Sequence, residues 1–184
     1  MNMQTLHYIL QMMPGALAAA AVYGCVLPRR RRRLAEKGLA SPWGREAVLL
    51  LFAMFAGGMA AITLTPWGFD WLEFLKGEWT GPFFSLGGVN LKPFATFGDL
   101  YILAGNIVMF LPFGFFPALL FRNFGWRKAL LTGFCVTAFI EVTQLLMGRA
   151  FDIDDLMLNT LGAFLGFALQ KALGRGLYCV PAGK

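Results

Sequence analysis

Acidic, basic and amide side chains are concentrated between residues 141 and 159, in and between two stretches that are otherwise apolar enough to cross a membrane. An ionised side chain at the centre of a membrane helix costs roughly 2.5–3.5 kcal/mol on insertion scales. A chain that keeps several of them together therefore uses them either to join helices or to form a site. The residues are Glu141, Gln144, Arg149, Asp152, Asp154, Asp155 and Asn159, and Asn106 lies in the preceding apolar stretch.

Arg149 is the fixed cation of this group. Its guanidinium can pair with Glu141 or Asp155 as a structural salt bridge, or it can hold a phosphate or carboxylate, since a guanidinium binds both in a bidentate manner. Asp152 and Asp155 carry hard oxygen atoms that suit a divalent cation such as Mg²⁺, Mn²⁺ or Ca²⁺. Acids at a helix N-terminus equally cap free N–H groups and complement the helix dipole, so the sequence leaves capping and metal binding both open.

Glu141 differs from the aspartates because no helix is predicted to begin beside it. We therefore interpret it as the candidate acid or base of a catalytic site, with Asp155 as the second catalytic candidate. The candidate ligand-binding residues are Asn106, Gln144, Arg149 and Asn159, and the candidate metal ligands are Asp152 and Asp155. A divalent cation is the one cofactor that these residues indicate.

The overall composition is that of an integral membrane protein. Of the 184 residues, 58% are hydrophobic and 14% are charged, and the mean hydropathy is +0.61, whereas soluble proteins average ~25% charged residues. The net charge of +6 comes from short basic segments between apolar ones, which indicates membrane topology rather than a nucleic-acid partner. The lipid bilayer is the expected environment, and soluble enzymes and nucleic-acid binders are excluded.

The sequence is also poor in residues for thiolate or imidazole chemistry. His7 is the single histidine, and the three cysteines form no CxxC pair, so sites that need paired histidines or cysteines are excluded. Cys25 and Cys135 fall in apolar stretches and are predicted to be buried, inert thiols.

Hydropathy predicts an all-α integral membrane protein with five transmembrane helices. The first apolar stretch is not a signal peptide, because no basic residue precedes it and arginines 29–33 follow it. Basic residues gather in connections 28–46 and 122–128, so the positive-inside rule predicts an outer N-terminus and a cytoplasmic C-terminus. The predicted spans are Thr5–Leu27, Ala47–Pro66, Asp99–Phe121, Ala129–Met147 and Asp154–Leu173.

We divide the chain accordingly into residues 1–66, two helices joined by a basic cytoplasmic loop; 67–98, an aromatic-rich outer loop; 99–173, a core of three helices; and 174–184, a cytoplasmic tail. Aromatic residues favour the membrane–water boundary, so residues 67–98 are expected to lie on the outer leaflet, either as an anchor or as a lid over a site. The stretch FDWLEFLKGEW is expected to form a short interfacial helix.

Helical rise places three of the polar residues at a common depth. At 1.5 Å per residue, Asn106 and Glu141 lie roughly 10 Å, and Asn159 about 7–8 Å, from the outer ends of their spans. Short connections make these three spans neighbours, so the sequence predicts an outward-facing polar pocket formed by spans three to five. Gly162 and Gly166 form a GxxxG motif, which permits close helix approach.

Three pieces of the sequence resemble the VanZ-like family of membrane proteins, which is named for a component of glycopeptide (teicoplanin) resistance. They are NLKPF at residues 90–94, GNIVMFLPFGF at 105–115 and IEVTQLLMGRAFDIDDLMLNTLGAFLG at 140–166. The resemblance spans about half of the chain and implies a bacterial cytoplasmic (inner) membrane protein. By this resemblance, the family pattern falls on Asn90, Pro93, Phe94, Asn106, Pro112, Gly114, Glu141, Gln144, Arg149, Asp152, Asp155, Asn159 and Gly162.

Three functions follow as alternatives. The resemblance implies a cell-envelope protein that lowers susceptibility to teicoplanin or other lipoglycopeptide antibiotics, with lipid-linked cell-wall intermediates as partners. The acidic and arginine residues indicate an intramembrane enzyme acting on a polyprenyl-phosphate or other lipid phosphate at the outer leaflet, in which Arg149 holds phosphate and Glu141 transfers protons. The third alternative is a non-catalytic scaffold or transporter-like binder, in which the polar residues specify helix packing.

Neutralising Glu141 distinguishes these alternatives. In a scaffold, the loss of one buried partner weakens folding, whereas a more stable but inactive Glu141→Gln protein indicates a site. The sequence leaves the oligomeric state and the presence of catalysis open.

Overall fold

The computed structural model describes residues 3–95, 97–174 and 176–182. Five of its helices are long and apolar enough to cross a membrane, which confirms the prediction of an all-α integral membrane protein with five spans. The orientation of the termini stays a prediction, and residues 175, 183 and 184 of the predicted tail lie outside the described residues. The spanning helices are α1 (Met3–Glu36), α2 (Trp43–Thr63), α4 (Leu100–Leu120), α5 (Trp126–Leu146) and α6 (Ile153–Leu173).

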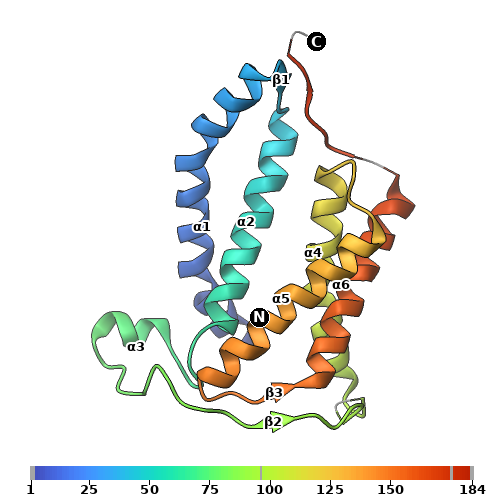
Figure 1. The fold of residues 1–184 in the computed structure, drawn as a ribbon. Helices are drawn as coiled ribbons and strands as arrows, with labels where there is room; N and C mark the ends of the chain where they lie inside the picture. Colours follow the sequence, from blue (N-terminus) through green and yellow to red (C-terminus); the bar gives the residue numbers. More distant parts are fainter. Residues whose placement is uncertain (1–2, 96, 175, 183–184) are drawn as a thin grey trace.

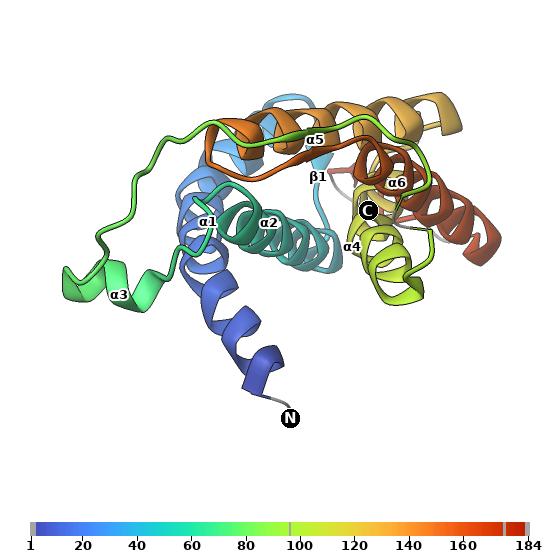
Figure 2. The same cartoon turned by 90° about the horizontal axis from the view of Figure 1, so that it is seen from below.

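The spanning helices form two groups. Figure 1 shows α1 beside α2 and α4 beside α6, with α5 crossing obliquely, and Figure 2 shows the same separation from below. The most extensive helix contacts are α4 with α6, α1 with α2, and α5 with α6, whereas α2 touches α4 over a much smaller area. The molecule is therefore a helix pair and a helix trio that meet along a narrow seam.

Glycines allow the close helix approaches within each group. In the pair, Gly15 and Gly57 each face the backbone carbonyl of the other. In the trio, Gly114 faces the carbonyl of Ala163, and Gly162 and Gly166 face the carbonyls of Ile107 and Leu111. A side chain at any of these positions would overlap a neighbouring backbone, so the close approach predicted for the GxxxG motif is confirmed.

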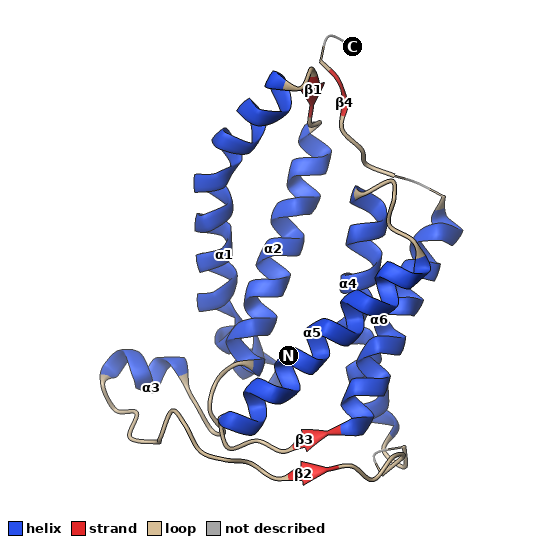
Figure 3. Cartoon of the chain, viewed as in Figure 1, coloured by secondary structure: helices blue, strands red, loops and turns tan. Residues whose placement is uncertain are grey.

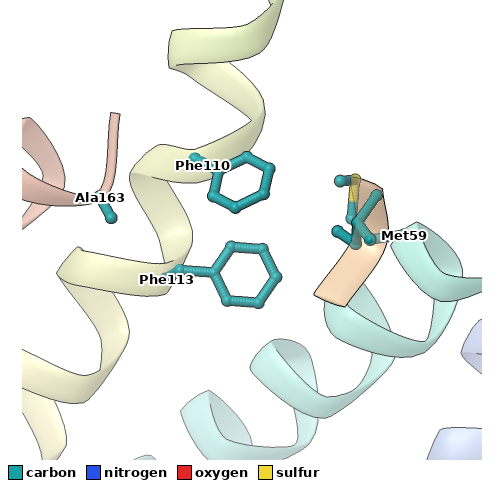
Figure 4. Packing of buried hydrophobic residues seen from close by; sticks show 5 residues of the cluster. Met59, Phe110, Phe113 and Ala163 are labelled. Carbon is teal, nitrogen blue, oxygen red and sulfur yellow. The ribbon is translucent and has the colours of Figure 1, made fainter. Parts of the chain in front are cut away.

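Aromatic side chains fill the seam between the two groups. Phe110 and Phe113 of α4 point toward Met59 of α2, with Ala163 on the other side of α4 (Figure 4). Phe52 of α2 packs edge-on against Phe113, with ring centres 5.8 Å apart. Most large apolar side chains outside this core are exposed, as expected for helices that face lipid.

Two expectations about the spans need correction. Cys25 and Cys135 are exposed on their helices rather than buried. α1 does not end near Leu27 but continues through the arginines at 29–33 to Glu36, because arginine is a good helix former and Arg32 pairs with Glu36 one turn later at 3.3 Å.

Arg30, inside this basic segment, joins α1 to α2. Its guanidinium donates to both carboxylate oxygens of Glu46, at 2.7 and 2.8 Å, and to the hydroxyl of Ser41 at 3.2 Å. Glu46 is buried and also accepts a hydrogen bond from the hydroxyl of Tyr23. The bidentate geometry makes this a strong charge-assisted contact, so Arg30 does more than set topology.

The connection 67–98 crosses the end of the molecule opposite Arg30. It contains α3 (Trp71–Lys76), the expected short helix, which Asp70 caps by accepting hydrogen bonds from the N–H groups of Leu72 and Glu73. Further along, β2 (Val89–Asn90) pairs in parallel with β3 (Phe151–Asp152) (Figure 3). At the Arg30 end, β1 (Leu39–Ala40) pairs with β4 (Val180–Pro181).

Candidate functional site

Glu141 lies at the centre of a hydrogen-bonded network at the β2–β3 end of the trio. It is 1% exposed, and its carboxylate accepts a hydrogen bond of 2.8 Å from the backbone N–H of Asp152. Asp152 in turn caps α6 by accepting from the N–H of Asp154 at 2.9 Å, and its other oxygen accepts from the side-chain amide of Asn90 at 3.0 Å. Glu141 therefore holds the start of α6 against the end of α5.

A second contact joins the NLKPF segment (residues 90–94) to the FDIDD segment (residues 151–155), as the bond between Asn90 and Asp152 also does. The backbone N–H of Phe94 donates to the buried carboxylate of Asp154 at 2.7 Å. Phe94 has a φ of 64°, in the left-handed region that a phenylalanine rarely adopts and that costs about 1–3 kcal/mol. The NLKPF and FDIDD segments, some 60 residues apart in sequence, thus form one structural unit.

The remaining polar residues of the trio form two hydrogen-bonded pairs, at different distances from the β2–β3 end. The amide of Asn106 donates to the carboxylate of Asp155, and both residues are half-buried. The amide of Asn159 donates to the hydroxyl of Thr137 at 2.9 Å, about 6 Å further from the β2–β3 end. Asn106 therefore lies at the depth of Asp155 rather than at that of Asn159. The polar residues that the sequence predicts at one common depth occupy two layers instead.

Gln144 and Arg149 occupy the turn that follows α5. Gln144 is buried, and its backbone carbonyl accepts hydrogen bonds from the N–H groups of Met147 and Arg149, at 3.0 and 2.9 Å. The guanidinium of Arg149 donates to the carbonyl of Ile62 on α2 at 3.2 Å and lies 5.9 Å from the centre of the Trp67 ring. Arg149 therefore reaches across the seam from the trio to the pair.

Among the described residues, no carboxylate lies at salt-bridge distance from Arg149. The ion pairs of this part of the chain join Arg30 to Glu46 and Arg32 to Glu36, and His7 lies 3.8 Å from Asp70, a contact that is ionic when His7 is protonated. Burial lowers the pKa of the Arg149 guanidinium, while the charges of Glu141 and Asp155 act in the opposite direction. The structural salt bridge considered for Arg149 is thus not present, and its positively charged guanidinium is partly desolvated.

The metal prediction at Asp152 and Asp155 stays a prediction. Within the described part of the chain, no three His, Cys, Asp or Glu side chains come together as a metal-binding group. Both oxygens of Asp152 already accept hydrogen bonds, from Asp154 and Asn90. The capping interpretation of Asp152 is therefore confirmed.

A cavity of about 320 Å³ lies beside Arg149, between the first two helices and the start of the outer connection. It is lined by His7, Tyr8 and Gln11 of α1, by Ile62 of α2 and by Trp67. Among the predicted site residues, all of which the structure describes, Arg149 is the one that lines it. The predicted pocket between spans three and five stays a prediction. Asn106 bonds to Asp155 and Asn159 to Thr137 there, while the amide oxygen of Asn159 is buried without a hydrogen-bond partner among the described residues.

Gln11 is a residue that the sequence analysis missed. It is buried, its amide N–H donates to Asp70 at 2.7 Å, and its amide oxygen accepts from the backbone N–H of Trp71 at 3.2 Å. Gln11 therefore holds the start of α3 against α1 beside the cavity. The signal that would have found it is the one used for Glu141, a polar residue inside an apolar span.

Comparison with known proteins identifies relatives of most of this structure. The VanZ/LLP1 family model matches residues 47–174, which include most of α2 and all of α4, α5 and α6. Protein VanZ of Enterococcus faecium is 30% identical over 82 residues, 44% of this chain and 51% of that protein, so the match spans about half the length of that relative. No solved structure matches the chain.

Proposed function

Because the chain belongs to the VanZ/LLP1 family, we propose that it is a cell-envelope protein of the bacterial cytoplasmic membrane that lowers susceptibility to teicoplanin and other lipoglycopeptide antibiotics. The antibiotic part of the proposal follows from the resemblance to the VanZ-like family and from the similarity to Protein VanZ of Enterococcus faecium. The structural observation that supports it is Arg149, which lies beside a cavity at one end of the membrane domain and has no carboxylate at salt-bridge distance among the described residues.

The proposal places this end at the outer surface. The arginines at 29–33 and the basic connection 122–128 lie at the opposite end of the helices (Figure 1), and the positive-inside rule assigns such segments to the cytoplasm. At the outer surface the protein meets lipid-linked cell-wall intermediates, which are the partners in this function.

The two groups of polar residues have different tasks in this function. Glu141, Asp152 and the carbonyl of Gln144 hold the turn after α5 in place, so they are positioning residues. Arg149 binds, because a cation without an ion-pair partner gains most from an incoming anion. Catalysis by Glu141 and Asp155 is the competing proposal, and it requires a substrate to reach side chains that now bind within the protein.

The test is the teicoplanin susceptibility of a sensitive bacterial host that expresses wild type, Arg149→Gln or Arg127→Gln at matched levels of membrane-inserted protein. Arg127 is the matched control because its guanidinium also lies near a tryptophan ring, 5.2 Å from that of Trp126, but does not line the cavity. We expect wild type and Arg127→Gln to raise the inhibitory concentration, and Arg149→Gln to return it to the level of the empty vector.

Folded and inserted wild-type protein that gives no protection would remove antibiotic resistance as the function. Equal protection by Arg149→Gln would leave resistance in place but take Arg149 out of it.

A further inference from the structure

A second recess lies on α1 next to the cavity beside Arg149. This groove has a volume of about 340 Å³, and it shares His7 and Gln11 with the cavity. Its walls are otherwise mainly apolar, from Leu10, Met13 and Leu17 on α1 and from Leu72 and Leu75 on α3. The two recesses therefore lie side by side, the one beside Arg149 forming a polar end and the one along α1 an apolar end.

The apolar end runs along the helix axis. Leu10, Met13, Pro14 and Leu17 are spaced by three and four residues, which places them on one face of α1. Leu17 lies ten residues beyond His7, roughly 15 Å deeper along the helix. Leu17 and Met13 are both exposed to the surroundings of the helix, so the groove opens sideways toward the lipid.

The cation of the polar end is Arg149, and among the described residues no carboxylate lines that cavity. Asp70 is the carboxylate that lines the groove, and it is already engaged by Gln11 and by the N–H groups of Leu72 and Glu73. Among the described residues, the guanidinium of Arg149 has one hydrogen bond, to the carbonyl of Ile62, and no ion pair. Burial lowers the pKa of this guanidinium against the opposing charges of Glu141 and Asp155.

We propose that these adjacent recesses bind a lipid phosphate, with the phosphate group at Arg149 and the hydrocarbon chain in the groove along α1. A guanidinium matches the geometry of phosphate oxygens, and a cavity of this size lies within the ~300–1,000 Å³ typical of small-molecule sites. The inference rests on the proposed function in placing this end of the protein at the outer leaflet.

An amphiphile accounts for both recesses, whereas a simpler ligand accounts for one. Inorganic phosphate would neutralise Arg149 but leave the apolar groove unused. A neutral lipid would fill the groove but leave Arg149 without an anion. The two recesses share His7 and Gln11 as lining residues, and this adjacency favours a single molecule with both parts.

The experiment measures binding of three probes to the purified full-length chain in detergent. The probes are farnesyl phosphate, farnesol and inorganic phosphate. The readouts are the melting temperature and the tryptophan fluorescence, to which Trp67 and Trp71 beside the recesses contribute. We expect farnesyl phosphate to bind at least tenfold more tightly than either other probe, since a hydrogen bond to a charged group contributes enough for that factor.

Two variants test the two ends separately. Arg149→Gln should weaken farnesyl phosphate at least tenfold and leave farnesol unchanged, whereas Arg127→Gln should change neither. Met13→Trp fills the groove and should weaken farnesyl phosphate, whereas Leu131→Trp, at an exposed position on α5, should not. The melting temperature of each variant without ligand shows whether it folds.

Equal binding of farnesol and farnesyl phosphate, or full binding by folded Arg149→Gln, would overturn the proposal. Because the assay contains no antibiotic, it separates this inference from the proposed function. Binding without protection against teicoplanin removes the resistance function alone, and protection without binding removes the lipid-phosphate site alone.

Discussion

The β2–β3 end of the α4–α5–α6 trio and the cavity beside α1 and α2 differ in how their polar residues are partnered. At the β2–β3 end, Glu141, Asp152 and Asp155 each accept a hydrogen bond from a neighbouring segment. At the cavity, no carboxylate of the described residues lies within salt-bridge distance of Arg149. The comparison indicates that a buried polar cluster in a membrane span can hold helices together, whereas the proposed ligand site lies beside that cluster, at the Arg149 guanidinium.

The largest loss of stability is expected when two helices of the trio are forced apart. A Cβ atom at Gly114 would lie 2.7 Å from the carbonyl carbon of Ala163 and 2.8 Å from the backbone N of Phe167. Because backbone atoms cannot move aside, we expect Gly114→Ala to cost more than the ~1–3 kcal/mol usual for overpacking. The melting temperature in detergent measures this, and Gly105→Ala on the same helix is the control, since nothing lies within 4 Å of its Cβ position. Similar melting temperatures for both variants would contradict the packing.

The second-largest loss of stability is expected when the ion pair between Arg30 and Glu46 is removed from the α1–α2 pair. Arg30→Gln leaves the buried carboxylate of Glu46 without its cation, which costs about 3 kcal/mol, the low end for such pairs because the Arg30 side chain is 25% exposed. The control is Arg32→Gln, whose pair with Glu36 is exposed and contributes ~0.3–0.5 kcal/mol. Unfolding of both variants measured by denaturant titration compares them, and an equal loss would show that Arg30 sets topology and nothing more.

A smaller loss of stability is expected when the hydrogen bond between the Glu141 carboxylate and the Asp152 N–H is removed. Glu141→Leu leaves the buried N–H of Asp152 without an acceptor, which costs about 1–3 kcal/mol. Glu141→Gln keeps an oxygen at that place and should lose less. Hydrogen exchange at the amide of Asp152 reports the contact directly. An amide that stays equally protected in Glu141→Leu would show that Glu141 does not hold this turn.

The smallest effect on stability is expected at the cavity. Arg149→Gln removes one hydrogen bond, to the carbonyl of Ile62, and also removes a partly desolvated charge, so the two effects oppose each other. The expected change in the free energy of unfolding is about 1 kcal/mol or less. A larger loss in the melting curve would place Arg149 among the structural residues, with Glu141.

Much of this structure is predictable from the sequence. Hydropathy identifies the five spans, and the cost of buried charge identifies Glu141, Asp155 and their neighbours as a group. Hydropathy does not predict the end of α1 correctly. The run of arginines is polar and is therefore assigned to a loop, whereas in the structure it is helical and α1 ends at Glu36. Helical rise also misjudges the layers, because it assumes that the spans begin at one common level.

The direction of Arg149 could not be predicted from the sequence. Glu141 and Asp155 are closer in sequence than Ile62 and Trp67, so a local salt bridge is the natural expectation. The turn at Gly148, which has a φ of 79°, and the hydrogen bond from the Arg149 N–H to the carbonyl of Gln144 accompany a side chain directed toward α2 instead. The catalytic roles of Glu141 and Asp155, and the ligand-binding roles of Asn106, Gln144 and Asn159, stay predictions.

The measurement that tests the account most directly is teicoplanin protection by Arg149→Gln and Glu141→Gln side by side, each normalised to the amount of folded protein in the membrane. The account predicts that Arg149→Gln loses protection while its melting temperature stays close to that of wild type, and that Glu141→Gln protects in proportion to its folded amount. Full protection by Arg149→Gln, together with none by well-folded Glu141→Gln, would contradict it and move the site from the cavity to the buried carboxylate.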